Sequence, residues 1–163
     1  MSAAAETIGD HAFHGCIELG DFILPATLKS IGESAFYECH AITAIDIPSG
    51  ISVIQRSTFS HCHGLTSVTL PDTVKEIGAS AFSDCPSITG IGIPAGVTKI
   101  GNSAFASCVG LQSIDLPSGI TELGMTCFYR CTGLTSVTVP SGVTKIGNGA
   151  FSSCTGLMDV SIP

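Results

Sequence analysis

The chain has 163 residues, about the size of one domain, and 44% of them are hydrophobic. One contiguous core is therefore expected rather than two independent domains or a disordered polar chain. No apolar run approaches the ~18 residues that a membrane-spanning helix needs, so no direct membrane span is expected. Six Lys and Arg against thirteen Asp and Glu give a net charge of −7, which lacks the basic surface that a phosphate backbone requires and excludes nucleic acid as an expected partner.

The N-terminal segment, Met1 to Glu6, has neither the basic region nor the apolar region of a secretory signal. No signal peptide is therefore expected within it. Neither Asn102 nor Asn148 begins a glycosylation sequon, because the residue two places on is Ala in both cases. The sequence alone thus leaves the compartment unknown.

A 23-residue repeat extends from Ile8 to Pro163 without an insertion. Phenylalanine, cysteine and proline all recur in the same register, and a fixed period in this range indicates a solenoid. We predict a single solenoid over residues 1–163, in which a partial first repeat is followed by six full repeats and seven strands form. The predicted core columns are Phe36, Phe59, Phe82, Phe105, Phe128 and Phe151, together with Cys39, Cys62, Cys85, Cys108, Cys131 and Cys154.

Each repeat combines two hydrophobic periods, as residues 65–87 illustrate. The spacing of two between Val68 and Leu70 indicates a strand with one buried face, whereas Ala81, Phe82 and Cys85 have the spacing of one helical turn. Each repeat is therefore expected to supply a strand, a corner and a short helical return. The predicted fold is a right-handed α/β solenoid with parallel strands on its concave face and short helices on the return side.

Hydroxyl and glycine residues mark the expected ends of these elements. A Ser or Thr two places before most column phenylalanines, such as Ser80, is expected to cap the helix. Glycines two places after the column cysteine are expected to end it in the left-handed conformation, and they are Gly64, Gly110, Gly133 and Gly156. Another glycine column precedes the predicted helix and is broken only by Gln55. Position 55 is therefore expected to tolerate a side chain.

The pattern Leu-x-x-Val-x-Leu-Pro-x-x-Val-x-x-Ile-Gly-x-x-Ala-Phe-x-x-Cys, seen at residues 65–85, resembles the BspA-type leucine-rich repeat, also called the Treponema pallidum type. The resemblance covers nearly the whole chain. It implies a curved solenoid, a cell-surface or extracellular location, and adhesion to host proteins, cells or other microbes. It carries no catalytic residue and no cofactor over to this chain.

The column cysteines are expected to be buried free thiols. Neighbouring strands lie about 4.8 Å apart, which falls within the Cα separation of a disulfide, so bridging between repeats remains an alternative, as does metal ligation. The parallel side-chain directions of a ladder and the odd count of seven column cysteines, from Cys16 to Cys154, favour free thiols. Cys127 occupies the small-residue position that holds Ala81 and Ala104 elsewhere, so it is interpreted as a packing substitution rather than a redox partner of Cys131.

His40 and His63 each follow a column cysteine one repeat apart, with His61 and Glu38 beside them. This spacing would allow a surface metal site. The sequence provides no outer ligand shell or tetrahedral closure, so no metal and no cofactor are expected.

A search for catalytic chemistry finds no nucleophile with a base, no paired carboxylates and no phosphate-binding glycine loop. The recurring serines and glycines are explained by their structural columns. The chain is therefore predicted not to be an enzyme.

The candidate protein-binding surface is the outward side of the strands, where small hydroxylated and acidic residues recur. The residues assigned to this concave face are Asp21, Asp46, Thr66, Thr69, Gln112, Asp115, Thr135, Thr138 and Asp159. Aromatic residues and Arg, which dominate tight interfaces, are absent from these positions. The Thr columns also agree with plain strand propensity, so this face alone does not identify a partner.

The leading interpretation is a protein-interaction solenoid for adhesion or surface recognition, and the alternative is a structural or accessory subunit of a larger assembly. The last repeat carries no polar cap. Its apolar residues Leu157, Val160 and Ile162 are the predicted edge interface, because an uncovered final strand leaves backbone groups unpaired beside an open core. Self-association or membership of a complex through this edge is the resulting hypothesis.

Overall fold

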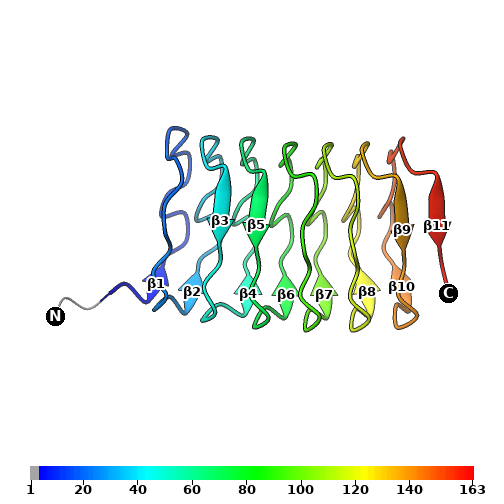
Figure 1. The fold of residues 1–163 in the computed structure, drawn as a ribbon, viewed down its shortest axis with the longest axis horizontal. Helices are drawn as coiled ribbons and strands as arrows, with labels where there is room; N and C mark the ends of the chain where they lie inside the picture. The colour runs from blue at the N-terminus through cyan, green and yellow to red at the C-terminus, as the bar shows by residue number, and fades with distance from the viewer. Residues whose placement is uncertain (1–3) are drawn as a thin grey trace.

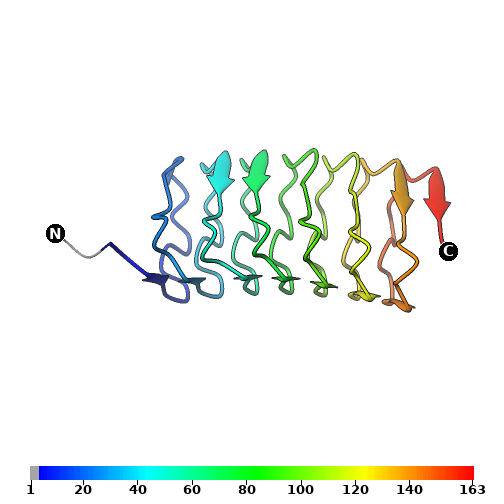
Figure 2. The ribbon, with the colours of Figure 1, turned by 60° about the horizontal axis from the view of Figure 1, so that its bottom comes forward.

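A computed structural model describes residues 4–163; Met1–Ala3, part of the segment in which no signal peptide is expected, lie outside the described residues. The chain winds into a rod of about seven coils with a spacing of about 23 residues (Figure 1). We number the coils 1 to 7 by the phenylalanine that each carries, from Phe13 to Phe151. The rod is nearly straight in two views (Figures 1 and 2), so the surface expected to be concave is nearly flat.

This surface, the strand face, consists of residues 21–23 and the equivalent three residues of each later coil. It contains β3 (Ala44–Asp46) paired in parallel with β5 (Ser67–Thr69), and β9 (Ser136–Thr138) paired in parallel with β11 (Asp159–Ser161). Residues 21–23, 90–92 and 113–115 do not form regular strands, so the strand predicted at this position is absent from these three coils. The segment 90–92 is Gly-Ile-Gly, and glycine weakens a strand because it has no side chain to pack and loses more backbone entropy.

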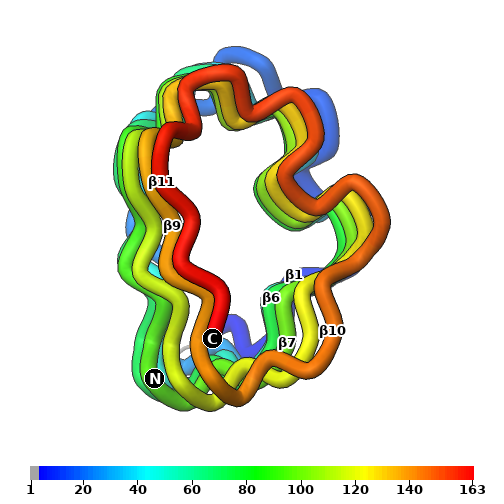
Figure 3. The backbone as a smooth tube through the Cα atoms, turned by 90° about the vertical axis from the view of Figure 1, so that its right-hand side faces the viewer, coloured from blue at the N-terminus to red at the C-terminus, as the bar shows by residue number. Residues whose placement is uncertain are grey.

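A second set of parallel strands, the short-strand ladder, lies at the predicted corner of each repeat. It comprises β1 (Thr7–Ile8), β2 (Ser30–Ile31), β4 (Val53–Ile54), β6 (Glu76–Ile77), β7 (Lys99–Ile100), β8 (Glu122–Leu123) and β10 (Lys145–Ile146). The strands from β4 to β10 form one five-stranded sheet, whereas β1 and β2 pair separately. Viewed along the rod, this ladder and the strand face lie on opposite sides of the coil (Figure 3), and the apolar side chains fill the space between them.

The return segment forms turns instead of the predicted helix, and residues 4–163 contain no helix. In coil 4, Ser80 and Asp84 have φ angles of 55° and 56°. A right-handed helix cannot pass through two left-handed residues four positions apart. The amides of Ser80, Phe82 and Asp84 donate to carbonyl oxygens of the next coil, while those of Ala81 and Ser83 donate to the carbonyl three residues back in the same turn.

The hydroxyl residues predicted to cap helices are therefore the left-handed corners of these turns. The same conformation recurs in coil after coil, for example at Ser57 and Ser103. A left-handed non-glycine residue costs roughly 1–2 kcal/mol, and the amide of Ser80 offsets this cost with a 2.8 Å hydrogen bond to the carbonyl of Asn102 in the next coil. We call the surface over residues 33–41 and their equivalents the turn face.

Both glycine columns are explained by close approach between coils. None of the four glycines predicted to end helices has a positive φ, so that interpretation is wrong. A Cβ on Gly133 would lie 2.6 Å from the carbonyl oxygen of Val109 in the preceding coil, and a Cβ on Gly101 would lie 2.6 Å from the amide nitrogen of Ala79. The amide of Gly101 donates to the carbonyl of Ile77 across the same interface. Bare backbone is therefore required where successive coils touch.

Gln55 interrupts the glycine column at the place where the short-strand ladder is also interrupted. In other coils the glycine amide donates to the preceding coil, as Gly78 does to Ile54 at 2.8 Å. Within the described residues the amide of Gln55 has no such bond, and β2 does not pair with β4. The absence of this close pairing leaves room for the Gln55 side chain.

The core consists of columns of identical side chains. The phenylalanine rings of consecutive coils stack with centroid separations such as 5.5 Å between Phe36 and Phe59 and between Phe82 and Phe105. The five rings from Phe36 to Phe128 are fully buried, whereas Phe151 in the last coil is half-buried. One continuous apolar cluster thus runs along the rod.

Candidate protein-binding face

The strand face presents short polar side chains from successive coils. In β5 the central Val68 is buried while Ser67 and Thr69 on either side are exposed, as the alternation of a strand requires. The nine residues assigned to the binding face are all exposed. Six of them belong to the strand face, and the other three, Thr66, Gln112 and Thr135, immediately precede it in their coils. No two of the acidic residues Asp46, Asp115 and Asp159 belong to adjacent coils.

Asp21 differs from the other residues of this face because its carboxylate accepts hydrogen bonds from the neighbouring coil. It accepts hydrogen bonds from the Thr43 hydroxyl at 2.6 Å, the Thr43 amide at 2.6 Å and the Ala44 amide at 3.0 Å. The Thr43 hydroxyl bond, followed by the backbone amides, lowers the pKa of Asp21. Asp21 therefore satisfies backbone donors at the start of β3.

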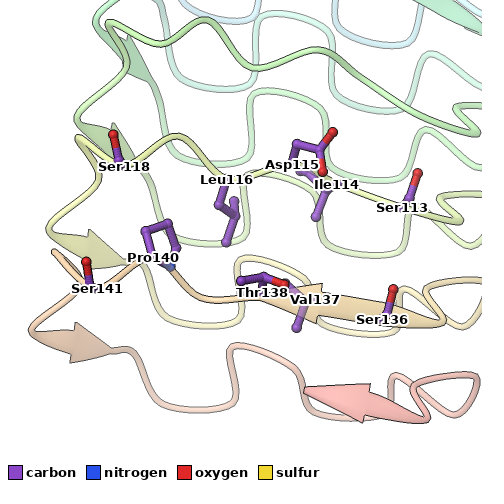
Figure 4. A pocket seen from close by; sticks show the side chains of 10 residues that line it. All are labelled: Ser113, Ile114, Asp115, Leu116, Ser118, Ser136, Val137, Thr138, Pro140 and Ser141. Atoms are coloured by element: carbon purple, nitrogen blue, oxygen red, sulfur yellow. The ribbon is translucent and has the colours of Figure 1, made fainter. Parts of the chain in front are cut away.

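Two shallow pockets open on the strand face. One of about 280 Å³ lies between coils 5 and 6 and is lined by Asp115, Leu116, Thr138 and Pro140 among others (Figure 4). Another of about 400 Å³ lies between coils 1 and 2 beside Asp21. Each pocket includes a segment, 113–115 or 21–23, that does not pair as a regular strand. The otherwise flat strand face is therefore hollowed at two places where its segments do not pair as regular strands.

The short-strand ladder carries a row of opposite charges that the sequence analysis did not single out. Lys99 pairs with Glu76 and Lys145 pairs with Glu122, each at 2.6 Å. These four residues occupy one column, so the 23-residue period of the sequence could have predicted that their charges lie side by side. A groove of about 480 Å³ runs over this ladder beside Gly101 and Gly124. Exposed pairs of this kind contribute less than about 1 kcal/mol each, and they neutralise one another.

The column cysteines form a thiol ladder within the core. From Cys39 to Cys154, each column thiol donates to the carbonyl oxygen of the phenylalanine 26 residues earlier, as Cys62 does to Phe36 and Cys85 does to Phe59, both at 3.1 Å. All the cysteines are in the free thiol form in this structure, and of them Cys16 is exposed. Burial raises the pKa of Cys39 to about 11 and that of Cys62 to about 12. Such thiols are poor nucleophiles because the thiolate is the reactive form.

The two ends of the rod expose apolar side chains. At the C-terminal coil Val160 is 41% exposed and Ile162 is 63% exposed, while Leu157 is half-buried against the core. At the N-terminal coil Phe13 stacks on Phe36 at 5.2 Å but remains 38% exposed. The predicted edge residues therefore lie in the final coil, Val160 within β11 and Leu157 and Ile162 flanking it in the chain.

Histidines and one aspartate gather on the turn face. His61 and His63 both lie close to Asp84, which belongs to the next coil. From the sequence, Glu38 was expected beside these histidines and Asp84 was not. The 23-residue period could have pointed to Asp84, because this residue occupies the same column as His61 one repeat later.

The fold and its columns agree with known relatives. Six copies of the BspA type Leucine rich repeat region match the chain, over residues 1–108 and 75–163. The chain therefore belongs to the family of BspA-type leucine-rich repeat proteins, and the resemblance inferred from the sequence is confirmed. No curated protein sequence matches it significantly. Between residues 4 and 163 there is no helix with the length and apolar character of a membrane span.

Solved structures of bacterial leucine-rich repeat proteins superpose closely. A protein from Bacteroides ovatus ATCC 8483 is 38% identical, with a TM-score of 0.93 over 96% of this chain and 41% of that one. The T. pallidum leucine-rich repeat protein is 29% identical, with a TM-score of 0.83 over 96% of this chain and 70% of that one. A leucine-rich repeat protein from Eubacterium ventriosum, 19% identical with a TM-score of 0.75 over 98% of this chain and 44% of that one, shares the fold. The chain thus spans less than half of the Bacteroides protein.

Proposed function

We propose that the chain is a non-enzymatic protein-interaction module that recognises its partner through the strand face, in adhesion or surface recognition. The observation that carries the proposal is the surface itself, to which six of the seven coils contribute exposed polar side chains; the exception is coil 4, where the segment is Gly-Ile-Gly. A flat, repetitive surface suits an extended partner, because a solenoid offers the same contact at each coil. Membership of the BspA-type family supports an interaction role.

The charge of this face indicates the chemistry of the partner. The outward positions include Asp46, Asp115 and Asp159, and none of the binding-face residues is basic. The net charge of the whole chain, −7, is negative like that of this face. A basic protein surface is therefore favoured, and attraction between exposed charges would weaken as ionic strength rises.

Adhesion of coated beads tests the proposal. Beads carrying the chain are incubated with cultured epithelial cells and with bacteria, at low and physiological salt. The chain with Asp46→Asn, Asp115→Asn and Asp159→Asn is compared with a control carrying Glu76→Gln and Glu122→Gln on the opposite side. We expect the strand-face variant to lose most of the binding and the control to retain it. Equal binding by all three proteins would contradict a role for this face.

The exposed apolar end favours the structural-subunit hypothesis as a second proposal. Val160 in β11 and its neighbours Met158 and Ile162 are exposed, and β11 has a partner strand, β9, on one side. An uncovered strand edge with apolar neighbours favours pairing with another chain or coil. We propose that this end is covered in the working assembly, with a second copy of the chain as one form of cover.

Light scattering tests whether the chain associates with a second copy through this end. Multi-angle scattering of the isolated chain across a concentration series is compared with Val160→Lys and Ile162→Lys, and with Ile23→Lys at the other end as a matched control. We expect the wild type to associate and the C-terminal lysines to suppress association more than Ile23→Lys. A wild type that stays monomeric, with a sharp unfolding transition that the lysines do not alter, would exclude self-association through this edge.

A further inference from the structure

All five histidines of the chain lie in one run of aromatic rings on the turn face. Consecutive ring centroids along this run are separated by 4.4–6.1 Å. The run passes through His11, His14, Tyr37, His61, His63 and His40 in that order. The family repeat does not require this run, because the equivalent positions of coils 5 and 6 hold Ser107, Val109, Arg130 and Thr132.

Within the run, one carboxylate joins two imidazoles. Asp84 Oδ2 lies 2.8 Å from His61 Nδ1 and 3.2 Å from His63 Nε2. One ligand atom from each of the three residues lies within 4.8 Å of the others. Zinc bonds to imidazole and carboxylate measure about 2.0–2.2 Å, which places the ligand atoms of a tetrahedral site roughly 3.3 Å apart. Small side-chain rotations would therefore suffice to bring the three atoms around one ion.

We propose that His61, His63 and Asp84 form a surface site for a divalent transition metal of the zinc class. Two imidazole nitrogens and one carboxylate oxygen suit a borderline-soft ion rather than calcium or magnesium, which prefer oxygen ligands alone. Three ligands from the chain leave the fourth tetrahedral position for water or for a donor from a partner. The site lies on the turn face and does not depend on the strand face as a binding surface.

The backbone holds the three ligands in register between two coils. His61 and Asp84 occupy the same left-handed position of consecutive turns, with φ angles of 59° and 56°. The His61 amide donates to the Ser83 carbonyl at 2.8 Å, which ties coil 3 to coil 4 beside the cluster. The carbonyl of His63 accepts a 2.6 Å hydrogen bond from the Ser87 hydroxyl. The ligands therefore lie on a rigid part of the fold, as a preorganised site requires.

Neighbouring rings restrict the imidazoles. His40 stacks on His63 at 4.4 Å with an interplanar angle of 17°, and Tyr37 packs against His61 at 5.0 Å. Stacking limits ring rotation and keeps His63 Nε2 directed at Asp84. These contacts pack the two imidazoles in a way that the sequence alone did not reveal.

Zinc titration of the whole chain tests the site. Isothermal titration with zinc chloride near pH 7.5 is accompanied by thermal melts with and without zinc. We expect one zinc per chain and a raised Tm. His63→Gln and Asp84→Asn should each weaken binding by about 10- to 100-fold or more. Asparagine at position 84 retains the tolerance for left-handed backbone, so the variant keeps the local fold.

Two control variants separate this site from other zinc-binding groups. His14→Gln removes an exposed imidazole whose Nδ1 lies 3.4 Å from that of His11, and Cys16→Ser removes the exposed thiol. Both should leave the zinc affinity unchanged. The proposal fails if the wild type binds zinc more weakly than about 1 mM. It also fails if the controls lose as much affinity as His63→Gln, or if His63→Gln and Asp84→Asn bind zinc like the wild type.

Discussion

The turn face and the strand face are built from the same seven coils but differ in how closely successive coils are joined. On the turn face, amides at alternate positions donate to the next coil, and the adjoining core holds the stacked phenylalanines and the thiol ladder. On the strand face, regular pairing is confined to β3 with β5 and β9 with β11, and pockets open between other coils. The comparison indicates that the turns and the core supply the stability, while the strand face is free to vary.

The largest contrast is expected between Phe82→Ala and Thr69→Ala. Phe82 is fully buried between two stacked rings, so its truncation should cost about 3–5 kcal/mol of unfolding free energy. Thr69 is exposed, and its backbone carbonyl still accepts from Ile47 after the change, so its loss should be below about 0.5 kcal/mol. Urea unfolding of both variants measures the difference, and equal losses would mean that the faces are inverted.

The next contrast is between Gly101→Ala and Gln55→Ala, two positions of one column. The new methyl group at position 101 meets the backbone of Ala79, which cannot move aside as a side chain could, and the expected loss is about 1–3 kcal/mol. Position 55 already holds a side chain and lacks the hydrogen bond across coils, so Gln55→Ala should change stability by less than about 0.5 kcal/mol. Thermal melts of the two variants would refute the close-approach argument if both cost the same.

The thiol ladder predicts a loss of stability in alkali. The folded pKa of Cys62 is raised to about 12 from 9.0, chiefly because burial penalises the thiolate. A group with a raised folded pKa contributes stability that is fully present below its unfolded pKa and is lost as pH rises towards the folded pKa. Cys62→Ala should therefore reduce the slope of unfolding free energy against pH by about 1.4 kcal/mol per pH unit between roughly pH 9 and 12.

The control for this prediction is Cys16→Ala, because Cys16 is exposed. It is measured beside Cys62→Ala by chemical unfolding at the same series of pH values. A Cys62→Ala slope equal to that of Cys16→Ala would show that the buried column is not the cause.

The smallest expected effect concerns Asp21 on the strand face. Its pKa is lowered by the Thr43 hydroxyl and by the amides of Thr43 and Ala44. A lowered folded pKa gives stability that is present above the unfolded pKa and lost as pH falls below about 3.8 through the folded value. We expect the Thr43 amide to lose hydrogen-exchange protection in that range and in Asp21→Asn at neutral pH. Asp46→Asn should leave it unchanged.

The repeat in the sequence determined the coil count, the buried columns and the family, because identical residues at a fixed period must occupy equivalent places in a stack. The same columns of Phe and Cys also marked the turn side of each coil. The prediction of a helix there was wrong, because its spacing cannot be distinguished from that of a tight turn such as Ala81 to Cys85. A turn forms instead of a helix when the carbonyl groups of a neighbouring coil are available to accept hydrogen bonds from the backbone N–H groups. That neighbouring coil is 23 residues away in the sequence.

Only the tertiary structure decided which residues from different coils meet. The glycine at position 101 was evident from the sequence. The backbone of Ala79, which leaves no room for a side chain there, belongs to the preceding coil. Asp84 and His63 are 21 residues apart and become neighbours at 3.2 Å because the coils stack with a fixed offset. The sequence determined the length of each coil and the columns that it buries, whereas the turns, the pockets and the histidine cluster depend on contacts between coils, which only the stacking creates.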